Sequence, residues 1–296
     1  MANGLKIGIG TVQFGTPYGI ANNKGVTRPD EVARILSRAD NLGGVVIDTA
    51  PSYGDSEQVL GRALRPGHSF RIVTKTPVFH TRTDITDVGV AVRDGLEGSL
   101  RALRQNEIYA LLIHHPEDAR GPYADELIDV LVRLKEQGKV RNIGVSIYGG
   151  DDLDFLADSR TLDIVQLPLN VFDRRLIDGG HLDTLKNHNV EIHARSVFLQ
   201  GLLLMAPEKL PPYFSPLLPL LERFRKDAET AGLTLLQAAL QFIAAQPAID
   251  DMIVGIDSFE HYGEILDAAT SGSDLDYTLY ACDDERMIDP RQWPAH

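Results

Sequence analysis

Apolar runs rich in Val and Ile recur along the 296-residue chain, with amphipathic segments between them. The run Val45-Val46-Ile47 places three β-formers side by side, which is the pattern of a strand buried on both faces of a parallel sheet. Eight such runs are predicted to form strands, at residues 6–10, 45–48, 71–75, 109–114, 142–146, 163–167, 190–196 and 252–255.

Between these runs, apolar residues spaced three and four positions apart predict helices. The predicted helices cover residues 27–42, 56–64, 87–103, 124–137, 151–159, 181–188, 217–231, 234–246 and 259–269. Thr27 is expected to cap the first of them. Eight strands that alternate with helices in one length of chain favour a closed (β/α)8 TIM barrel, an α/β fold with eight parallel strands.

A doubly wound open sheet is the alternative fold, and it requires a third Gly in the turn after the first strand. That turn reads Gly8-Ile9-Gly10-Thr11-Val12-Gln13, so Gln13 breaks the phosphate-binding pattern. We find no change of composition that would divide the chain. We therefore expect residues 1–296 to form a single barrel domain, with a loop insertion after the seventh strand at 198–216 and the tail 271–296 packed near the barrel mouth.

The composition argues against some classes of function. Acidic residues outnumber basic ones, 42 to 29, and the net charge of −13 disfavours nucleic acid or an anionic membrane as a partner. The single Cys282 cannot form an internal disulfide or a cysteine metal cage, as expected in a reducing compartment. The sequence shows no signal peptide and no apolar run long enough to cross a bilayer, so we expect a cytoplasmic protein.

Polar side chains stand at the ends of several predicted strands. All strands of a barrel point the same way, so their ends meet at one mouth, which carries the active site in barrels of this kind. Taken singly, each of these side chains could be a polar residue at the edge of a loop. Together they predict a functional site that includes Asp48, Lys75, His114, Ser146, Gln166, Arg195 and Ser196.

Four residues, Asp48, Tyr53, Lys75 and His114, form a set suited to proton transfer at a carbonyl oxygen. A phenol is a weak acid, and an ammonium group near its hydroxyl lowers its pKa. A carboxylate paired with the Lys would hold it in place, and an imidazole could orient the carbonyl or share the proton. The protein has no hydride of its own, so this chemistry requires a nicotinamide cofactor.

The sequence resembles the aldo-keto reductase superfamily across nearly its whole length. The matching segments follow the family's order and distances: 44–54, Ser56-Glu57, Leu60-Gly61, 73–76, 111–116, 138–146, Val165-Gln166 and Asn170. The resemblance implies a (β/α)8 barrel and a catalytic tetrad of Asp48, Tyr53, Lys75 and His114, with Tyr53 as the general acid. It also implies that Ser146 and Gln166 hold the nicotinamide carboxamide.

Two positions depart from the family pattern near the nicotinamide. Ile147 stands where many relatives have an Asn that binds the carboxamide, so one hydrogen bond is expected to be missing. Arg195 stands where an aromatic ring usually stacks on the nicotinamide. Its guanidinium plane is expected either to stack in the same way or to turn away to a carboxylate.

The segment after the eighth strand bears on cofactor choice. Relatives that prefer NADP have basic residues there, whereas this chain has Asp257 and Glu260, which would repel a 2′-phosphate and can accept a hydrogen bond from a ribose hydroxyl. NAD(H) is therefore favoured over NADP(H), although both acids also suit the start of the last helix as caps. Further cofactor contacts are expected from Thr11, Ser196, Gln200, Gly201 and Gly255.

We predict an NAD(P)(H)-dependent oxidoreductase that interconverts an aldehyde, ketone or sugar carbonyl and its alcohol. The alternative is an NAD(H)-binding regulator that uses the same scaffold to bind a protein partner. A metal-dependent hydrolase is disfavoured, because the first strand offers no ligand and the adjacent His114 and His115 point to opposite faces of their strand. Substrate identity depends on loop side chains, including those of the tail with Trp293.

Overall fold

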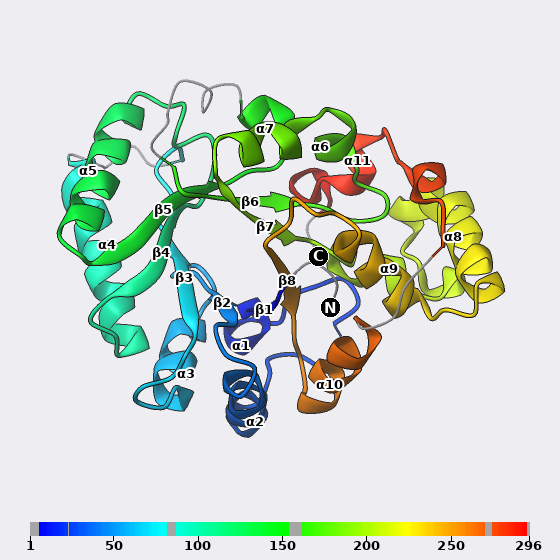
Figure 1. The fold of residues 1–296 in the computed structure, drawn as a ribbon, viewed down its shortest axis with the longest axis horizontal. Helices are drawn as coiled ribbons and strands as arrows, with labels where there is room; N and C mark the ends of the chain where they lie inside the picture. Colours follow the sequence, from blue (N-terminus) through cyan, green and yellow to red (C-terminus); the bar gives the residue numbers. More distant parts are fainter. Residues whose placement is uncertain (1–5, 23, 82–86, 154–161, 270–273, 295–296) are drawn as a thin grey trace.

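The computed structural model describes residues 6–22, 24–81, 87–153, 162–269 and 274–294. Its eight parallel strands close into a barrel in sequence order, with β1 paired to β8 (Figure 1). The strands are β1 (Lys6–Gly10), β2 (Val46–Asp48), β3 (Arg71–Lys75), β4 (Ile108–Ile113), β5 (Val140–Ser146), β6 (Ile164–Pro168), β7 (Glu191–Arg195) and β8 (Asp251–Gly255). The predicted (β/α)8 barrel is confirmed, and the open-sheet alternative is wrong.

The interior of the barrel contains one compact apolar cluster. Its buried members are Val46, Val73, Ala110, Leu112, Ile164 and Ile253. Side chains two positions apart on a strand point to the same face. The residues two positions after Val46, Val73, Leu112 and Ile164 therefore also point into the barrel. Those residues are Asp48, Lys75, His114 and Gln166. The strand pattern therefore places four polar side chains together just above an apolar floor.

Helices surround the barrel and pack their apolar faces on it (Figure 1). The longer ones are α2 (Pro29–Asp40), α3 (Ser56–Ala63), α4 (Val88–Leu103), α5 (Ala124–Glu136), α7 (His181–Asn187), α8 (Leu218–Thr230), α9 (Leu235–Ala244) and α10 (Phe259–Ala268). The side chains of Asp87, Thr234 and Ser258 cap α4, α9 and α10 by accepting a backbone N–H of the first turn.

The cap predicted at Thr27 is wrong. Helix α2 begins at Pro29, whose fixed φ suits the first helical position, and Arg28 precedes it without a side-chain capping bond. Thr27 is buried, and its backbone N–H donates to the carbonyl of Gln13 (2.8 Å). The helix predicted at 151–159 lies largely outside the described residues, and its described part is a short 310 turn at Gly150–Asp152.

Within the described residues, three α-helices were not predicted: α1 (Val12–Gly15), α6 (Arg175–Asp178) and α11 (Glu285–Ile288). Each has four residues, which is too short for a 3.6-residue periodicity to show in the sequence. The insertion after β7 forms three 310 turns, η3 (Leu199–Leu204), η4 (Pro207–Lys209) and η5 (Pro212–Leu217). The described tail holds η6 (Tyr277–Tyr280), α11 and η7 (Pro290–Gln292).

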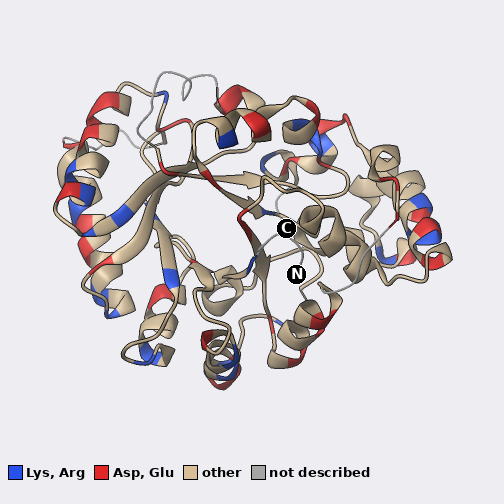
Figure 2. Cartoon of the chain, viewed as in Figure 1, with Lys and Arg blue, Asp and Glu red and all other residues tan. Residues whose placement is uncertain are grey.

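The described part of the tail, residues 274–294, contacts the rest of the protein through an ion pair and a ring contact. Glu285 forms an ion pair with Arg175, which follows β6 (2.7 Å), and the Trp293 ring packs edge-on against Phe214 in the insertion (4.9 Å between centroids). Figure 2 shows that many of the acidic and basic residues lie along the outer helices. Among the described helices, none combines the length and apolarity needed to cross a membrane.

Candidate active site

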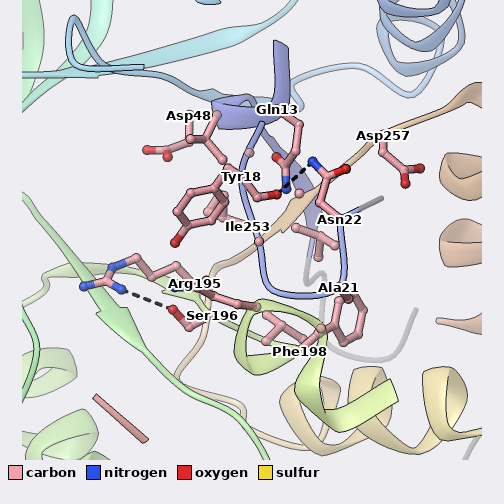
Figure 3. A pocket seen from close by; sticks show the side chains of 18 of the residues that line it. Gln13, Tyr18, Ala21, Asn22, Asp48, Arg195, Ser196, Phe198, Ile253 and Asp257 are labelled. Carbon is pink, nitrogen blue, oxygen red and sulfur yellow. Dashed lines mark hydrogen bonds between the residues drawn. The ribbon is translucent and has the colours of Figure 1, made fainter. Parts of the chain in front are cut away.

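A cavity of about 800 Å³ opens at the carboxyl ends of the strands (Figure 3). It is lined by every residue that the sequence predicted for the site. These are Asp48, Tyr53, Lys75, His114, Thr11, Ser146, Gln166, Arg195, Ser196, Gln200, Gly201, Gly255 and Asp257. Residues that are up to 246 positions apart in the chain, from Thr11 to Asp257, thus face one space.

A buried ion pair forms the floor of this cavity. The Lys75 ammonium donates to Asp48 Oδ1 (2.7 Å) and to the backbone carbonyl of Thr49 (2.9 Å). The side-chain amide of Gln166 also donates to Asp48 Oδ1 (2.7 Å). Burial lowers the pKa of Lys75, while the negative charge of Asp48 acts in the opposite direction and favours the ammonium. Asp48 therefore holds both Lys75 and Gln166 in place.

Tyr53 lies against this pair. Its ring centroid is 5.0 Å from Lys75 Nζ. Burial raises the pKa of Tyr53 well above its ordinary value, and Asp48 raises it further, while Arg195 acts to lower it. The expected net lowering of the phenol pKa is wrong for this arrangement, because burial outweighs the effect of nearby positive charge. Tyr53 is consequently a protonated phenol at neutral pH.

The position of Tyr53 depends on a close approach of two backbones. A Cβ placed on Gly15 would lie 1.8 Å from the Tyr53 carbonyl oxygen and 2.5 Å from the backbone nitrogen of Ser56. Only Gly permits this contact between α1 and the turn that carries Tyr53. The first loop therefore sets the depth at which the phenol enters the cavity.

His114 lies next to Tyr53, with ring centroids 6.1 Å apart in an edge-on arrangement. Its backbone N–H donates to Thr76 Oγ1 (3.2 Å) at the end of β3. Burial lowers the pKa of His114 to about 2, and the nearby positive charges of Lys75, His115 and Arg195 add to the effect. The imidazole is therefore neutral at physiological pH, so it can orient a carbonyl but does not carry an exchangeable positive charge.

Ser146 and Gln166 lie beside each other, with Ser146 Oγ 3.4 Å from Gln166 Oε1. The Gln166 amide nitrogen donates to Asp48, and the Ser146 hydroxyl donates to the Gln166 oxygen, so the two polar side chains line the cavity as one hydrogen-bonded group. Thr11 is more occupied: its hydroxyl donates to the Asp48 carbonyl (2.8 Å) and accepts from Ser56 Oγ (2.8 Å). Thr11 thus ties the end of β1 to β2.

Arg195 turns to a partner that the sequence did not suggest. Its guanidinium lies 4.5 Å from the ring centroid of Tyr148 and donates to the Ile147 carbonyl (2.9 Å) and to Ser196 Oγ (3.2 Å). The alternative of a carboxylate partner is therefore wrong. Arg291 from the tail lies over the same Tyr148 ring at 4.0 Å. Two cations from distant segments thus hold one aromatic side chain at the cavity wall.

Asp257 reaches the far end of the cavity (Figure 3). Its carboxylate accepts from His261 Nδ1 (3.0 Å) and lies 3.4 Å from Lys24 Nζ. The hydrogen bond from His261 is the main cause that lowers the pKa of Asp257 to about 2. Ser258 caps α10, so the alternative of a capping role is wrong for Asp257. Glu260 lies in the first turn of α10 and pairs with Arg34 (3.3 Å).

The insertion forms part of the cavity wall through a left-handed backbone turn. Gln200 has φ of 53° and Gly201 has φ of 96°. A Cβ on Gly201 would lie 2.5 Å from the Cβ of Ala21, so Gly permits the insertion to meet the first loop. Figure 3 labels Ala21 in the first loop and Phe198 in the insertion.

Several residues that line the cavity were not predicted as site residues, among them Gln13, Tyr18, Tyr148 and His261. Tyr148 had a signal, because it stands two positions beyond Ser146 and therefore on the same side of the chain after β5. Tyr18 lies in the first loop and is 41% exposed. Gln13 and His261 had no signal in the sequence, since their placement depends on loop conformation.

The protein is an oxidoreductase, and the carboxyl-terminal mouth of its closed barrel brings Asp48, Tyr53, Lys75 and His114 together. The chain belongs to the Aldo/keto reductase family, whose sequence model matches residues 6–276. This confirms the resemblance drawn from the sequence. Members of the family use nicotinamide cofactors.

Three relatives place the chain within this family. It is 28% identical to the L-galactose dehydrogenase of Arabidopsis thaliana, over 99% of this chain and 95% of the relative. It is 28% identical to the NADH-specific methylglyoxal reductase of Escherichia coli, over 67% of this chain and 65% of the relative. The solved structure of the glycerol dehydrogenase from Gluconobacter oxydans is similar with a TM-score of 0.70 at 25% identity, over 98% of this chain and 93% of that one.

Proposed function

We propose that this protein interconverts an aldehyde, ketone or sugar carbonyl and its alcohol, with a nicotinamide cofactor and with Tyr53 as the proton donor. The observation that carries the proposal is the position of the Tyr53 phenol, beside both Lys75 and His114 on the wall of the cavity. A protonated phenol, a buried ammonium group and a neutral imidazole are groups suited to proton transfer to a carbonyl oxygen.

The residues that line the cavity fit a dinucleotide. A volume of about 800 Å³ is sufficient for a large ligand. Gln13 contributes a buried side-chain oxygen that accepts no hydrogen bond from any described residue, so the wall offers an acceptor for a ligand. We expect the carboxamide at Ser146 and Gln166, and the rest of the cofactor along Thr11, Arg195, Ser196, Gln200, Gly201, Gly255 and Asp257.

When bound, the nicotinamide supplies the hydride for the carbonyl carbon or accepts it from the alcohol carbon. Tyr53 donates its proton to the carbonyl oxygen as negative charge develops there. The Lys75 charge stabilises the phenolate that remains, and Asp48 keeps Lys75 in position without itself touching the substrate. His114 donates a hydrogen bond that orients the carbonyl, since its imidazole is neutral. In the reverse direction the Tyr53 phenolate accepts the proton of the alcohol.

We propose that NAD(H) is preferred over NADP(H). Asp257 presents a carboxylate at the end of the cavity opposite the candidate catalytic group, where it can accept a hydrogen bond from a ribose hydroxyl. Lys24 lies near Asp257 and offsets part of its negative charge. The proposed preference for NAD(H) therefore depends on a carboxylate whose charge is partly neutralised. The NADH specificity in the name of the Escherichia coli relative agrees with this choice.

The proposed substrates are small polar carbonyl compounds, with sugars and polyols foremost. The names of two relatives refer to the oxidation of a sugar and of glycerol. The wall near Tyr53 presents the ring of Tyr148 and the cation of Arg195, and both groups suit hydroxylated ligands. The direction of the reaction follows from the substrate and cofactor levels in the cell.

The function is tested by following the absorbance of NADH with a panel of aldehydes, sugars and polyols. We expect turnover by the wild type, and a loss of at least about 100-fold in kcat for Tyr53→Phe, because the proton donor is removed. NADH binding should persist in this variant. Tyr123→Phe, which changes an exposed ring, is the matched control. Tight NADH binding without turnover of any substrate by the wild type would instead support an NAD(H)-binding regulator with a protein partner.

A further inference from the structure

Three potential metal ligands gather beside the candidate active site. His80, His115 and Glu117 each place one ligating atom within 4.8 Å of the other two. His80 follows β3, whereas His115 and Glu117 follow β4, and these strands are neighbours in the barrel. We propose that these three side chains bind a divalent cation of the zinc class at the rim of the cavity.

His80 is held in one orientation by a buried carboxylate. Its Nδ1 lies 2.9 Å from Oδ1 of Asp118, whose side chain is 0% exposed. Asp118 also accepts the backbone N–H of Phe79 (3.1 Å), so the carboxylate is fixed to the same loop. A metal-binding His usually pairs its second ring nitrogen with a carboxylate in this way. Nε2 of His80 is the nitrogen left to bind an ion.

Glu117 supplies an oxygen that lacks a donor. Its Oε1 forms an ion pair with Arg291 (3.0 Å), whereas Oε2 is buried and accepts no hydrogen bond from any described residue. A buried carboxylate oxygen without a partner costs free energy, because it has lost its water. A cation bound to Oε2 would remove that cost while Arg291 keeps its contact with Oε1.

The donor set selects the class of ion. Two imidazoles and one carboxylate are typical ligands of zinc, which bonds to them at about 2.0–2.2 Å and accepts water in a fourth position. Neighbouring ligands of a tetrahedral ion lie about 3.4 Å apart, so the three atoms have to approach one another slightly. The side chain of His80 is 29% exposed and has room to do so.

A second cluster of similar composition does not carry the same proposal. Glu191, His193 and Asp251 meet at the amino-terminal end of the barrel. Arg71 already donates to Glu191 (2.8 Å) and to Asp251 (2.7 Å). The guanidinium neutralises both carboxylates and would repel a cation. At the site formed by His80, His115 and Glu117, by contrast, the neighbouring cation is Arg291, which contacts only Oε1 of Glu117.

The rim site is joined to the cavity on two sides. The expectation that His114 and His115 point to opposite faces is wrong, because both residues follow the end of β4 at Ile113 and their rings lie 4.7 Å apart. His114 lines the cavity. Glu117 contacts Arg291, which lies over the ring of Tyr148, another lining residue. A bound ion would therefore restrain two parts of the cavity wall without touching the candidate catalytic group itself.

The site is tested by metal binding to the full-length protein, freed of metal with a chelator. We expect one equivalent of Zn²⁺ by calorimetry and, with Co²⁺ as a probe, the strong visible absorption of a tetrahedral site. His80→Gln and Glu117→Gln should each weaken binding by more than about tenfold, and Asp118→Asn by about tenfold. His188→Gln changes an exposed His directly after α7 and should leave binding unchanged.

Circular dichroism and thermal unfolding show whether each variant is folded, and His80→Gln changes the most exposed of the three ligands. The proposal is overturned if the folded wild type and the His80→Gln variant bind Zn²⁺ with the same affinity. It is also overturned if His188→Gln loses binding to the same extent, because the ion would then be bound elsewhere. These readouts do not depend on catalysis, so they stand apart from the proposed reaction.

Discussion

Lys75 and Asp48 form an ion pair that is almost fully removed from solvent: Nζ and Oδ1 lie 2.7 Å apart, and the side chains are 1% and 7% exposed. The pair joins β2 to β3 at the level where the apolar barrel interior ends. Breaking a buried pair by removing one partner leaves an uncompensated charge, which costs more than the pair itself contributes. The pair is therefore the part of the site in which stability and chemistry are most closely linked.

Replacement of the carboxylate should destabilise the protein. We expect Asp48→Asn to lower the free energy of unfolding by about 3–5 kcal/mol, because Lys75 keeps its charge in a buried place. The double variant Asp48→Asn with Lys75→Met should recover part of this loss, since the unpaired charge is gone. Urea unfolding measures both, and turnover should be low in both. An Asp48→Asn protein as stable as the wild type would contradict a charged Lys75.

The pH dependence of reduction follows from Tyr53 and His114. Reduction needs the protonated phenol, whose pKa is raised, so the rate should fall only well above neutral pH. His114 has a pKa of about 2, so it should add no inflection near its ordinary value of about 6.5. We expect kcat/KM for carbonyl reduction to be flat from about pH 6 to about pH 9. An acidic inflection that His114→Gln abolishes would show that the imidazolium takes part.

The contact between Gly15 and Tyr53 provides a test of positioning. Gly15→Ala forces a Cβ against the Tyr53 carbonyl, so we expect kcat to fall by at least about tenfold and stability by about 1–3 kcal/mol. Gly98 in α4 is the matched control, because a Cβ there meets no atom within 4 Å. Gly98→Ala should leave kcat unchanged and add up to about 1 kcal/mol of stability through helix propensity. Steady-state kinetics and urea unfolding measure kcat and the free energy of unfolding of both variants. Equal values of kcat for the two variants would contradict a positioning role of Gly15.

The preference for NAD(H) over NADP(H) should depend on Asp257 and not on Glu260, which lies in the first turn of α10. Asp257→Ser removes the carboxylate and frees Lys24, so NADPH affinity should rise by about fivefold, which corresponds to about 1 kcal/mol. Glu260→Gln removes an acid that is paired with Arg34 and should change the NADH to NADPH ratio little. Fluorescence titration of both variants with both cofactors measures this. Equal shifts in the two variants would mean that only the overall negative field matters.

The alternation of strand residues made much of the site predictable. Asp48, Lys75 and Gln166 were expected at one mouth because each ends a run of apolar β-formers, and in a parallel barrel all such ends meet. Tyr53 was predicted from its chemistry and from the family resemblance, since a residue in a turn has no periodicity to place it. The longer helices were predictable for the same reason as the strands, whereas the four-residue helices were not.

The contacts that the polar side chains of the site make with one another were not predictable from the sequence. Arg195 was expected to meet a cofactor ring or a carboxylate, and it lies over Tyr148, which Arg291 covers at 4.0 Å. Lys75 was expected to lower the pKa of Tyr53, and burial raises it. Both outcomes depend on how far a side chain is removed from water and on which charged group it faces.

The sequence by itself determined the barrel, the mouth at which its polar strand ends gather, and the family to which the chain belongs. These properties follow from local periodicity and from short motifs, which are written along the chain. Only the tertiary structure decided that Gln166 donates to Asp48, that Lys24 faces Asp257, and that His80 meets Glu117. Those relationships join distant segments across space, and their strength is set by burial and distance, which no local pattern records.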